Sequence, residues 1–214
     1  MSKIKPGQVG DFNGKIGQVV ISKWRNLTVG RATPKKSTKA PTAKQVNQRS
    51  AFKLVLTFLK QLKVAVNAGY AAKGNLSPMN VAVQYHLANA ITGVAPNFAI
   101  DYPKVVLSKG ELFGVYEAAV AGIAGSTMHV TWTIDAIDVE GTSEDDAVFI
   151  VFYSPATGFS LTNSHVANRS ALTASVKMPR LFTGTSVHVW MFLVGVDGKS
   201  VSLADYLGLK AVIA

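Results

Sequence analysis

The sequence predicts an α+β protein with a basic N-terminal arm that contains a β-hairpin, then a helical hairpin, then a C-terminal immunoglobulin-like β-sandwich. A change of period predicts this order, because apolar residues recur at helical spacing in the middle of the chain and alternate singly from about residue 104. A polar, proline-bounded stretch precedes the helical part. We therefore expect three segments, at residues 1–40, 41–103 and 104–214.

The charge distribution separates the two ends of the chain. Residues 1–73 carry 15 Lys or Arg residues and one acid, whereas residues 74–214 carry 7 Lys or Arg residues and 11 acids. The whole chain has a net charge of +10. A basic half joined to a mildly acidic half indicates contact either with phosphate groups or with the acidic half of a neighbouring copy, and a solubilising surface is the plainer alternative.

The N-terminal arm contains two short runs that are typical of strands. Ile16–Ser22 and Leu27–Ala32 are separated by a plausible hairpin connection at residues 23–26. An isolated two-stranded hairpin is marginal in water, so we expect it to pair with the C-terminal sheet or with another subunit. Residues 33–41 read as a basic linker.

Two helices should follow the linker. Thr42 and Gln45 form a capping box at the start of the first helix, which Gly69 should end. Ser77 and the following proline predict the start of the second helix, and Gly93 should close it. We expect the two helices to form an antiparallel hairpin.

Alternating apolar residues and regularly spaced turn signals predict a sandwich of short strands after residue 104. Trp132 or Trp190 is the expected central aromatic residue of its core. The expected strands are Val105–Ser108, Val115–Ile123, Thr127–Ile134, Ala147–Tyr153, Ala171–Met178, Ser186–Val196 and Leu209–Ile213.

Composition bounds the classes of protein to consider. A chain of 214 residues with 48% apolar residues is able to form a core, and the lack of cysteine excludes disulfides and thiolate chemistry. The chain start has no apolar run typical of a secretory signal, and no stretch reaches the roughly 18 apolar residues of a spanning helix. We expect no membrane contact, and a location in the cytoplasm or in a virion-like assembly.

The sequence contains no pattern that predicts catalysis. His86, His129, His165 and His188 each lack a second His or Cys at metal-ligand spacing, and we expect all four at the surface. A Gly-x-Ser-x-Gly elbow is absent, and the N-terminal glycines match no phosphate-binding or dinucleotide-binding fingerprint. We therefore expect a protein that is not an enzyme, with no catalytic residue, no metal and no cofactor.

Two charged groups are the candidate contact sites. The basic group could neutralise phosphates, with one tryptophan to stack on a base, or could bind acids on a neighbouring copy. It consists of Lys15, Lys23, Trp24, Arg25, Arg31, Lys35, Lys36 and Lys39. The acidic group is a solvated loop or a patch that receives the basic arm of a neighbour. It consists of Asp138, Glu140, Glu144, Asp145 and Asp146.

Several motifs resemble an uncharacterised bacterial protein family of about this length, most strongly over residues 10–105. They are the stretch from Gly14 to Asn26, Val29-Gly30-Arg31, Pro34, Thr42, Gln45, Gln48-Arg49, Phe52, Ser77-Pro78-Met79-Asn80 and Ile100-Asp101-Tyr102. The Gly-Lys-x-Gly strand, the basic hairpin and the pattern Thr-x-x-Gln-x-x-x-Arg-x-x-Phe are also similar to phage and prophage structural proteins. That similarity implies a virion, filament or tail-like role and carries over no catalytic residue.

Together these observations predict a structural protein that assembles with other copies of itself into a shell, tube or filament, with the basic arm between subunits. The alternative is a cytosolic protein that binds nucleic acid through the same arm. An enzyme of an unrecognised class is the third possibility, for which the sequence nominates no site.

Overall fold

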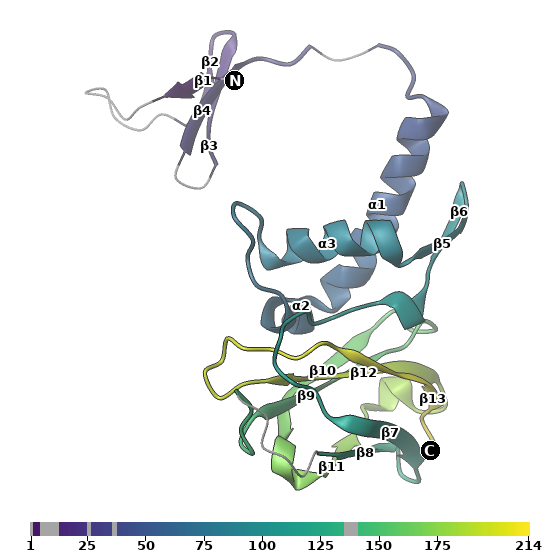
Figure 1. Ribbon diagram of the computed structural model, residues 1–214. Helices are drawn as coiled ribbons and strands as arrows, with labels where there is room; N and C mark the ends of the chain where they lie inside the picture. The colour runs from purple at the N-terminus through teal and green to yellow at the C-terminus, as the bar shows by residue number, and fades with distance from the viewer. Residues whose placement is uncertain (1, 5–12, 25–26, 36–37, 135–140) are drawn as a thin grey trace. The chain divides into compact units, whose positions relative to one another are not determined.

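The computed structural model describes residues 2–4, 13–24, 27–35, 38–134 and 141–214. The chain divides into two compact units, residues 1–42 and residues 43–214. All helices and both hydrophobic clusters of the described residues belong to the second unit (Figure 1). The α+β class expected from the sequence is confirmed, with sheets whose named strands pair antiparallel.

The first unit is a four-stranded antiparallel sheet with the order β1-β4-β3-β2. Its strands are β1 Ser2–Ile4, β2 Gly14–Ile16, β3 Val19–Trp24 and β4 Leu27–Ala32. The hairpin of β3 and β4 was expected to pair with the C-terminal sheet or with another subunit. Within the chain it pairs instead with β1, which adds to β4, and with β2, which adds to β3. A turn at residues 17–18, where Gly17 has a φ of +56°, divides the run that the sequence suggested as one strand.

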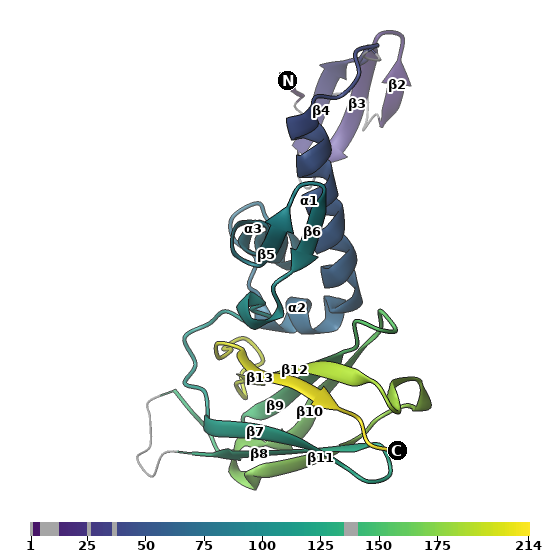
Figure 2. The same ribbon diagram turned by 90° about the vertical axis from the view of Figure 1, so that its right-hand side faces the viewer.

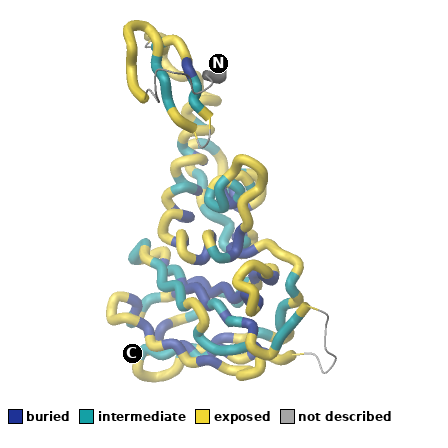
Figure 3. The backbone as a smooth tube through the Cα atoms, turned by 90° about the vertical axis from the view of Figure 1, so that its left-hand side faces the viewer, coloured by how far each residue is buried: buried dark blue, intermediate teal, exposed yellow. Residues whose placement is uncertain are grey.

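This sheet has almost no buried interior. Among the described residues of the unit for which burial is defined, Gly30 alone is buried. The others are exposed or half-buried (Figure 3). A sheet normally covers one face with a second layer of structure. The described residues of the first unit form no such layer.

The second unit begins with helices α1 Ala43–Gln61, α2 Lys63–Gly69 and α3 Pro78–Asn89. Leu62 (φ −95°, ψ 19°) separates α1 from α2, so the expected first helix is broken once. The Ser77 hydroxyl accepts a hydrogen bond from the Asn80 amide at 3.3 Å, which confirms the predicted cap. α3 crosses α1 rather than lying antiparallel to it, which corrects the expected hairpin geometry (Figure 1).

The strand pattern of the C-terminal part is largely confirmed. The strands are β7 Tyr116–Ile123, β8 Thr127–Thr133, β9 Ala147–Tyr153, β10 Ser160–Asn168, β11 Thr173–Lys177, β12 Ser186–Val194 and β13 Asp205–Ala211. They form one sheet of order β10-β9-β12-β13 and another of order β11-β8-β7. Short 3₁₀ turns lie between elements, namely η1 Tyr102–Lys104, η2 Arg169–Ala171 and η3 Arg180–Phe182.

The structure differs from the elements expected from the sequence in three places. Residues 105–108 form no strand, although Val105, Leu107 and Ser108 are buried. A small hairpin, β5 Ile91–Val94 with β6 Asn97–Ile100, takes the place of the last turn expected of the second helix. The sequence did not predict β10, because this strand is polar and its pairing with β9 shifts register between Asn163 and Ala167.

The second unit has three layers (Figure 2). The sheet that contains β12 lies in the middle, between the helices on one side and the sheet β11-β8-β7 on the other. β12 is buried along its whole length except for Ser186. Trp190 and Phe192 project into the cluster shared with the helices, whereas Val189 and Met191 project into the cluster between the sheets.

The two tryptophans expected in the core belong to different clusters. Trp132 of β8 packs between the two sheets, and its indole N–H donates to the Arg169 carbonyl at 2.8 Å. Trp190 packs on the other side of β12, beneath the helices. The helices therefore use one face of the middle sheet as the floor of their own core, together with Leu59 and Leu62.

We predict that Leu59→Ala will lower the free energy of unfolding by about 2–5 kcal/mol, because Leu59 is fully buried and its removal leaves a cavity. Phe52→Ala, at an exposed position of the same helix, should change it by no more than about 0.5 kcal/mol. Urea unfolding followed by circular dichroism measures both values. Equal losses for the two variants would contradict the assigned helical core.

Candidate functional site

Cross-strand register decides which basic residues of the first unit share a face. Val20 of β3 pairs with Lys15 of β2 and with Arg31 of β4, so the three side chains project from the same face of the sheet. Trp24 lies on that face too, because it follows Val20 by four residues along β3. Lys15 and Arg31 are exposed, and 51% of Trp24 remains accessible. The structure thus brings two cations and one aromatic residue of the predicted group together.

The opposite face of this sheet is mainly apolar. Ile16, Val19 and Ile21 project from it, and Lys23 follows them on the same face. Ile16 and Val19 remain 54% and 44% accessible. The described part of the first unit therefore has one face with Lys15, Arg31 and Trp24 and another with Ile16, Val19 and Ile21.

Two other predicted basic residues whose structure is described lie outside the sheet. Lys35 and Lys39 are exposed in the segment that follows β4. Arg25 and Lys36 lie outside the described residues. The predicted group is thus divided over both faces of the sheet and the segment after it, rather than gathered in one patch.

The predicted acidic group is also divided. Glu144 and Asp145 are exposed in the loop before β9, whereas Asp138 and Glu140 lie outside the described residues. Asp146 is only 1% accessible, and its carboxylate pairs with Arg169 at 3.0 Å. Asp146 is therefore unavailable to a partner, and we remove it from the acceptor group.

Arg169 is a hub that sequence analysis did not identify. Its guanidinium donates to the Asp146 carboxylate at 3.0 Å, to the Gly114 carbonyl at 2.7 Å and to the Phe113 carbonyl at 2.6 Å. Its own carbonyl accepts from Trp132. Arg169 is 7% accessible; its bonds with Asp146 and Trp132 are buried, and those to Phe113 and Gly114 are partly buried. A single arginine whose partner is 23 residues distant leaves no spacing signal in a sequence.

Two histidines expected at the surface are buried. His86 donates from Nδ1 to the Ala82 carbonyl at 2.7 Å, and its Nε2 has no hydrogen-bond partner among the described residues. His188 stacks on the Tyr102 ring at 3.7 Å, and its Nδ1 lies 2.7 Å from the Tyr206 hydroxyl. Burial lowers the pKa of both imidazoles, to about 4 for His188. Both are therefore neutral near pH 7.

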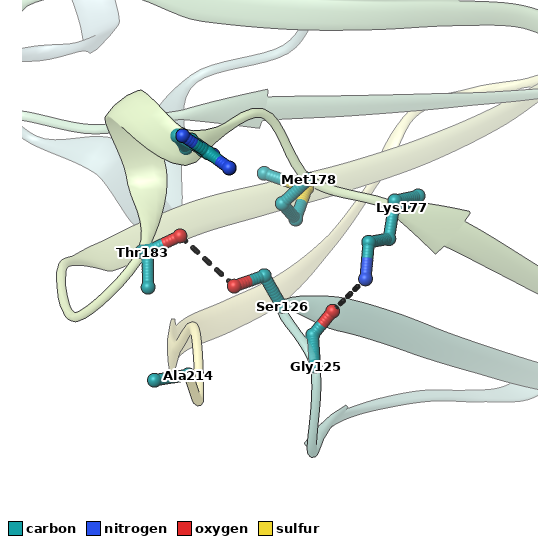
Figure 4. Close-up of a pocket in the computed structure, with 7 residues that line it drawn as sticks. Gly125, Ser126, Lys177, Met178, Thr183 and Ala214 are labelled. Atoms are coloured by element: carbon teal, nitrogen blue, oxygen red, sulfur yellow. Dashed lines mark hydrogen bonds between the residues drawn. The ribbon is translucent and has the colours of Figure 1, made fainter.

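A hollow of about 580 Å³ lies where the end of the chain meets the turn between β7 and β8 (Figure 4). Its polar groups largely bond to one another. Lys177 donates to the Gly125 carbonyl, and the hydroxyls of Ser126 and Thr183 lie 2.9 Å apart. The backbone amide of Ser126 also donates to Ile213, so these bonds attach the C-terminal segment to the sandwich.

Two further searches bear on the class of site. Within the described ranges, no group of three or more His, Asp or Glu residues is placed to hold a metal ion. None of the helices in the described part of the chain is long and apolar enough to span a membrane.

We predict that Arg169→Ala will lower the free energy of unfolding by about 3–5 kcal/mol, because Asp146 is left charged and buried without its cationic partner, although the Ser143 amide still donates to it. Arg180→Ala, which removes an exposed arginine, should change it by no more than about 0.5 kcal/mol. Denaturant titration of the two variants and the parent protein measures the difference. Similar midpoints for both variants would show that the buried pair is dispensable.

We also predict that stability will fall as the pH drops from about 6.5 toward 4. In that range the imidazole of His188 takes up a proton in the unfolded chain but not in the folded one, because burial lowers its folded pKa to about 4. His188→Gln keeps a hydrogen-bonding group beside Tyr206 but does not titrate. Its stability should therefore fall less over this pH range than that of the parent protein. His86, whose pKa burial also lowers, accounts for part of the fall that remains. Thermal melts at several pH values test this, and equal pH dependence in both proteins would refute the assignment.

Comparisons with known proteins place the chain in a family. A comparison with curated proteins finds no match. Among solved structures, the fn3 domain of human collagen alpha-1(XX) chain is similar at 17% identity with a TM-score of 0.34, over 50% of this chain and 93% of that one. The resemblance to phage structural proteins stays a prediction, whereas the resemblance to an uncharacterised family is confirmed. The model of that family matches residues 11–208, and the chain belongs to the Family of unknown function (DUF6266).

Proposed function

We propose that this chain is a structural protein, not an enzyme, that acts by binding other copies of itself through its N-terminal sheet. The observation that carries the proposal is that the described residues of this unit form no layer over the sheet, and that Gly30 alone is buried among those with defined burial. Burial of an apolar face is the main favourable term in forming such a sheet. A partner surface that covers it supplies this term.

The composition of the sheet supports a protein partner. Exposed Ile16 and Val19 on one face and Trp24 on the other provide the apolar and aromatic contacts that dominate protein interfaces. Residues 1–42 carry nine Lys or Arg residues and one acid, whereas residues 104–214 carry seven Lys or Arg residues and ten acids. Copies of this chain therefore offer each other surfaces of opposite charge.

Strand pairing also bears on how a second copy would make contact. β1 and β2 already occupy the two edges of the β3–β4 hairpin. We therefore expect contact through a face of the sheet. The proposed product is a multi-copy shell, tube or filament, in keeping with the resemblance to phage structural proteins.

We also propose that the sandwich is immunoglobulin-like. Its seven antiparallel strands form sheets of three and four, and the chain crosses from one sheet to the other between β8 and β9, between β10 and β11, and between β11 and β12. Trp132 packs between the sheets, as the central tryptophan of such domains does. A domain of this kind suits a structural role, because its edges and loops are available for contacts while its core stays closed.

Nucleic-acid binding is the second candidate function. One observation favours it, namely that Lys15, Trp24 and Arg31 share a face, as cations and an aromatic platform do in proteins that bind single strands. This function predicts binding to a fluorescent single-stranded oligonucleotide that weakens steeply with salt.

We predict that the full-length protein will have a solution mass that is a multiple of its 22.7 kDa chain mass. The double variant Lys15→Glu with Arg31→Glu should lower that mass, because it reverses the charge of the basic face. Lys60→Glu with Lys63→Glu makes the same charge change at exposed positions of the second unit and should leave the mass unchanged. Light scattering behind a sizing column at physiological salt measures all three.

The absorbance ratio at 260 and 280 nm separates the two candidate functions in the same experiment. A multiple mass without nucleic acid supports assembly by protein contacts. A protein that is monomeric at every concentration tested contradicts the proposed assembly. If that monomer binds the oligonucleotide and the Lys15→Glu, Arg31→Glu variant does not, the second function is correct.

A further inference from the structure

One end of the sandwich is ordered by the Arg169 network. Arg169 bonds the backbone of residues 113–114, the Asp146 carboxylate and the Trp132 indole to one another. Ser170, the next residue, bonds from its amide and its hydroxyl to the Glu144 carbonyl, each at 3.1 Å. Segments before β7, at the end of β8, before β9 and after β10 therefore meet at this end and are held in place.

The same end exposes large apolar side chains. Phe113 and Tyr116 remain 47% and 42% accessible, and their rings lie 6.4 Å apart. Leu172 is also exposed and follows the 3₁₀ turn that contains Arg169. A hydrophobic surface of this kind, on a segment whose backbone is fixed by a buried ion pair, loses little conformational freedom when a partner covers it.

Leu172 has a backbone conformation that a leucine rarely adopts. Its φ of +58° lies in the left-handed region, where glycine is at ease and a side chain with a Cβ costs energy. The side chain is at the same time exposed, so burial within the subunit does not account for it. A leucine at this position is therefore explained better by contact with a partner than by the stability of the subunit.

Acidic residues adjoin this apolar surface, either next to it in the chain or through the bonds of Ser170 to the Glu144 carbonyl. Glu117 follows Tyr116 on β7 and is exposed. Glu144 and Asp145 are exposed in the loop that Ser170 and Asn168 hold, and the Asn168 amide donates to the Asp145 carboxylate at 3.0 Å. We name this surface the Arg169 end; it consists of Phe113, Tyr116, Glu117, Glu144, Asp145 and Leu172.

We infer that the Arg169 end of one copy receives the basic face of the N-terminal sheet of a second copy. This inference rests on the proposed self-assembly and names its receiving surface. Lys15 and Arg31 supply the charge that complements Glu117 and Glu144, and Trp24 supplies an aromatic side chain that matches the exposed rings. The apolar part gives affinity, and the charges set the orientation of the two copies.

The contact joins two different surfaces, so the size of the assembly depends on the rotation that relates one copy to the next. Two copies that exchange N-terminal sheets close into a dimer. If each copy instead binds the next one along, the rotation between neighbouring copies decides the product. The copies form a ring if that rotation closes and an open filament if it does not. In either case each copy uses its first unit as donor and its second unit as receiver.

The test uses full-length proteins with reversed charges. The donor variant carries Lys15→Glu and Arg31→Glu, and the receiver variant carries Glu117→Lys and Glu144→Lys. Each variant alone should be monomeric by light scattering, because like charges face each other across the contact. An equimolar mixture should recover the mass of the parent assembly, because the acidic sheet then meets the basic end and the basic sheet meets the acidic end.

A second variant tests the apolar part without a change of charge. Leu172→Gly relieves the left-handed backbone and removes the exposed side chain. It should melt at the parent temperature or above while its association weakens by about tenfold or more, as loss of an interface anchor does. A lower melting temperature with unchanged association would assign Leu172 to the subunit itself and overturn its role in docking.

The outcomes separate this inference from the function on which it rests. If the donor variant dissociates and the receiver variant assembles like the parent protein, self-assembly stands and the Arg169 end is not the receiver. If the parent protein is itself a monomer, the proposed function fails and the inference fails with it. Dissociation of both variants without recovery in the mixture would also overturn the direct contact.

Discussion

The second unit depends on the burial of β12 on both of its faces. Val189 and Met191 close the core between the two sheets, and Trp190 and Phe192 close the core beneath the helices. A strand in the middle of a sheet satisfies its backbone hydrogen bonds through its two neighbours, which allows both of its faces to be apolar. The helices and the sandwich therefore share one layer, and neither core is complete without it.

Arg169 joins the chain segments that meet at one end of the sandwich, as β12 joins the two hydrophobic clusters. A buried charge is tolerated only when its donors and its charge are satisfied, and Arg169 meets this condition with Asp146 and two backbone carbonyls. These bonds position Phe113 and the loop before β9. The exposed surface at this end is thus a product of a buried ion pair, which links the stability of the fold to the proposed docking.

The two units differ in how much apolar surface their described residues enclose. The second unit encloses two hydrophobic clusters and exposes an ordered, partly acidic end. The described residues of the first unit form a sheet with a basic face and an apolar face, and they add no second layer to it. In the assembly that we propose, the second unit of one copy covers the sheet of another copy, whose described residues enclose no core of their own.

The sequence by itself determined the local elements: the Ser77 cap, the bounds of β9 and β4, and the continuous apolar run of β12, because capping and periodicity are encoded by near neighbours. It also determined the charge division and the membership of the family. Only the tertiary structure decided that Asp146 is buried, that His188 lies inside, and that Lys15 and Arg31 share a face. These facts depend on pairings between distant segments, and such pairings leave no local period to read.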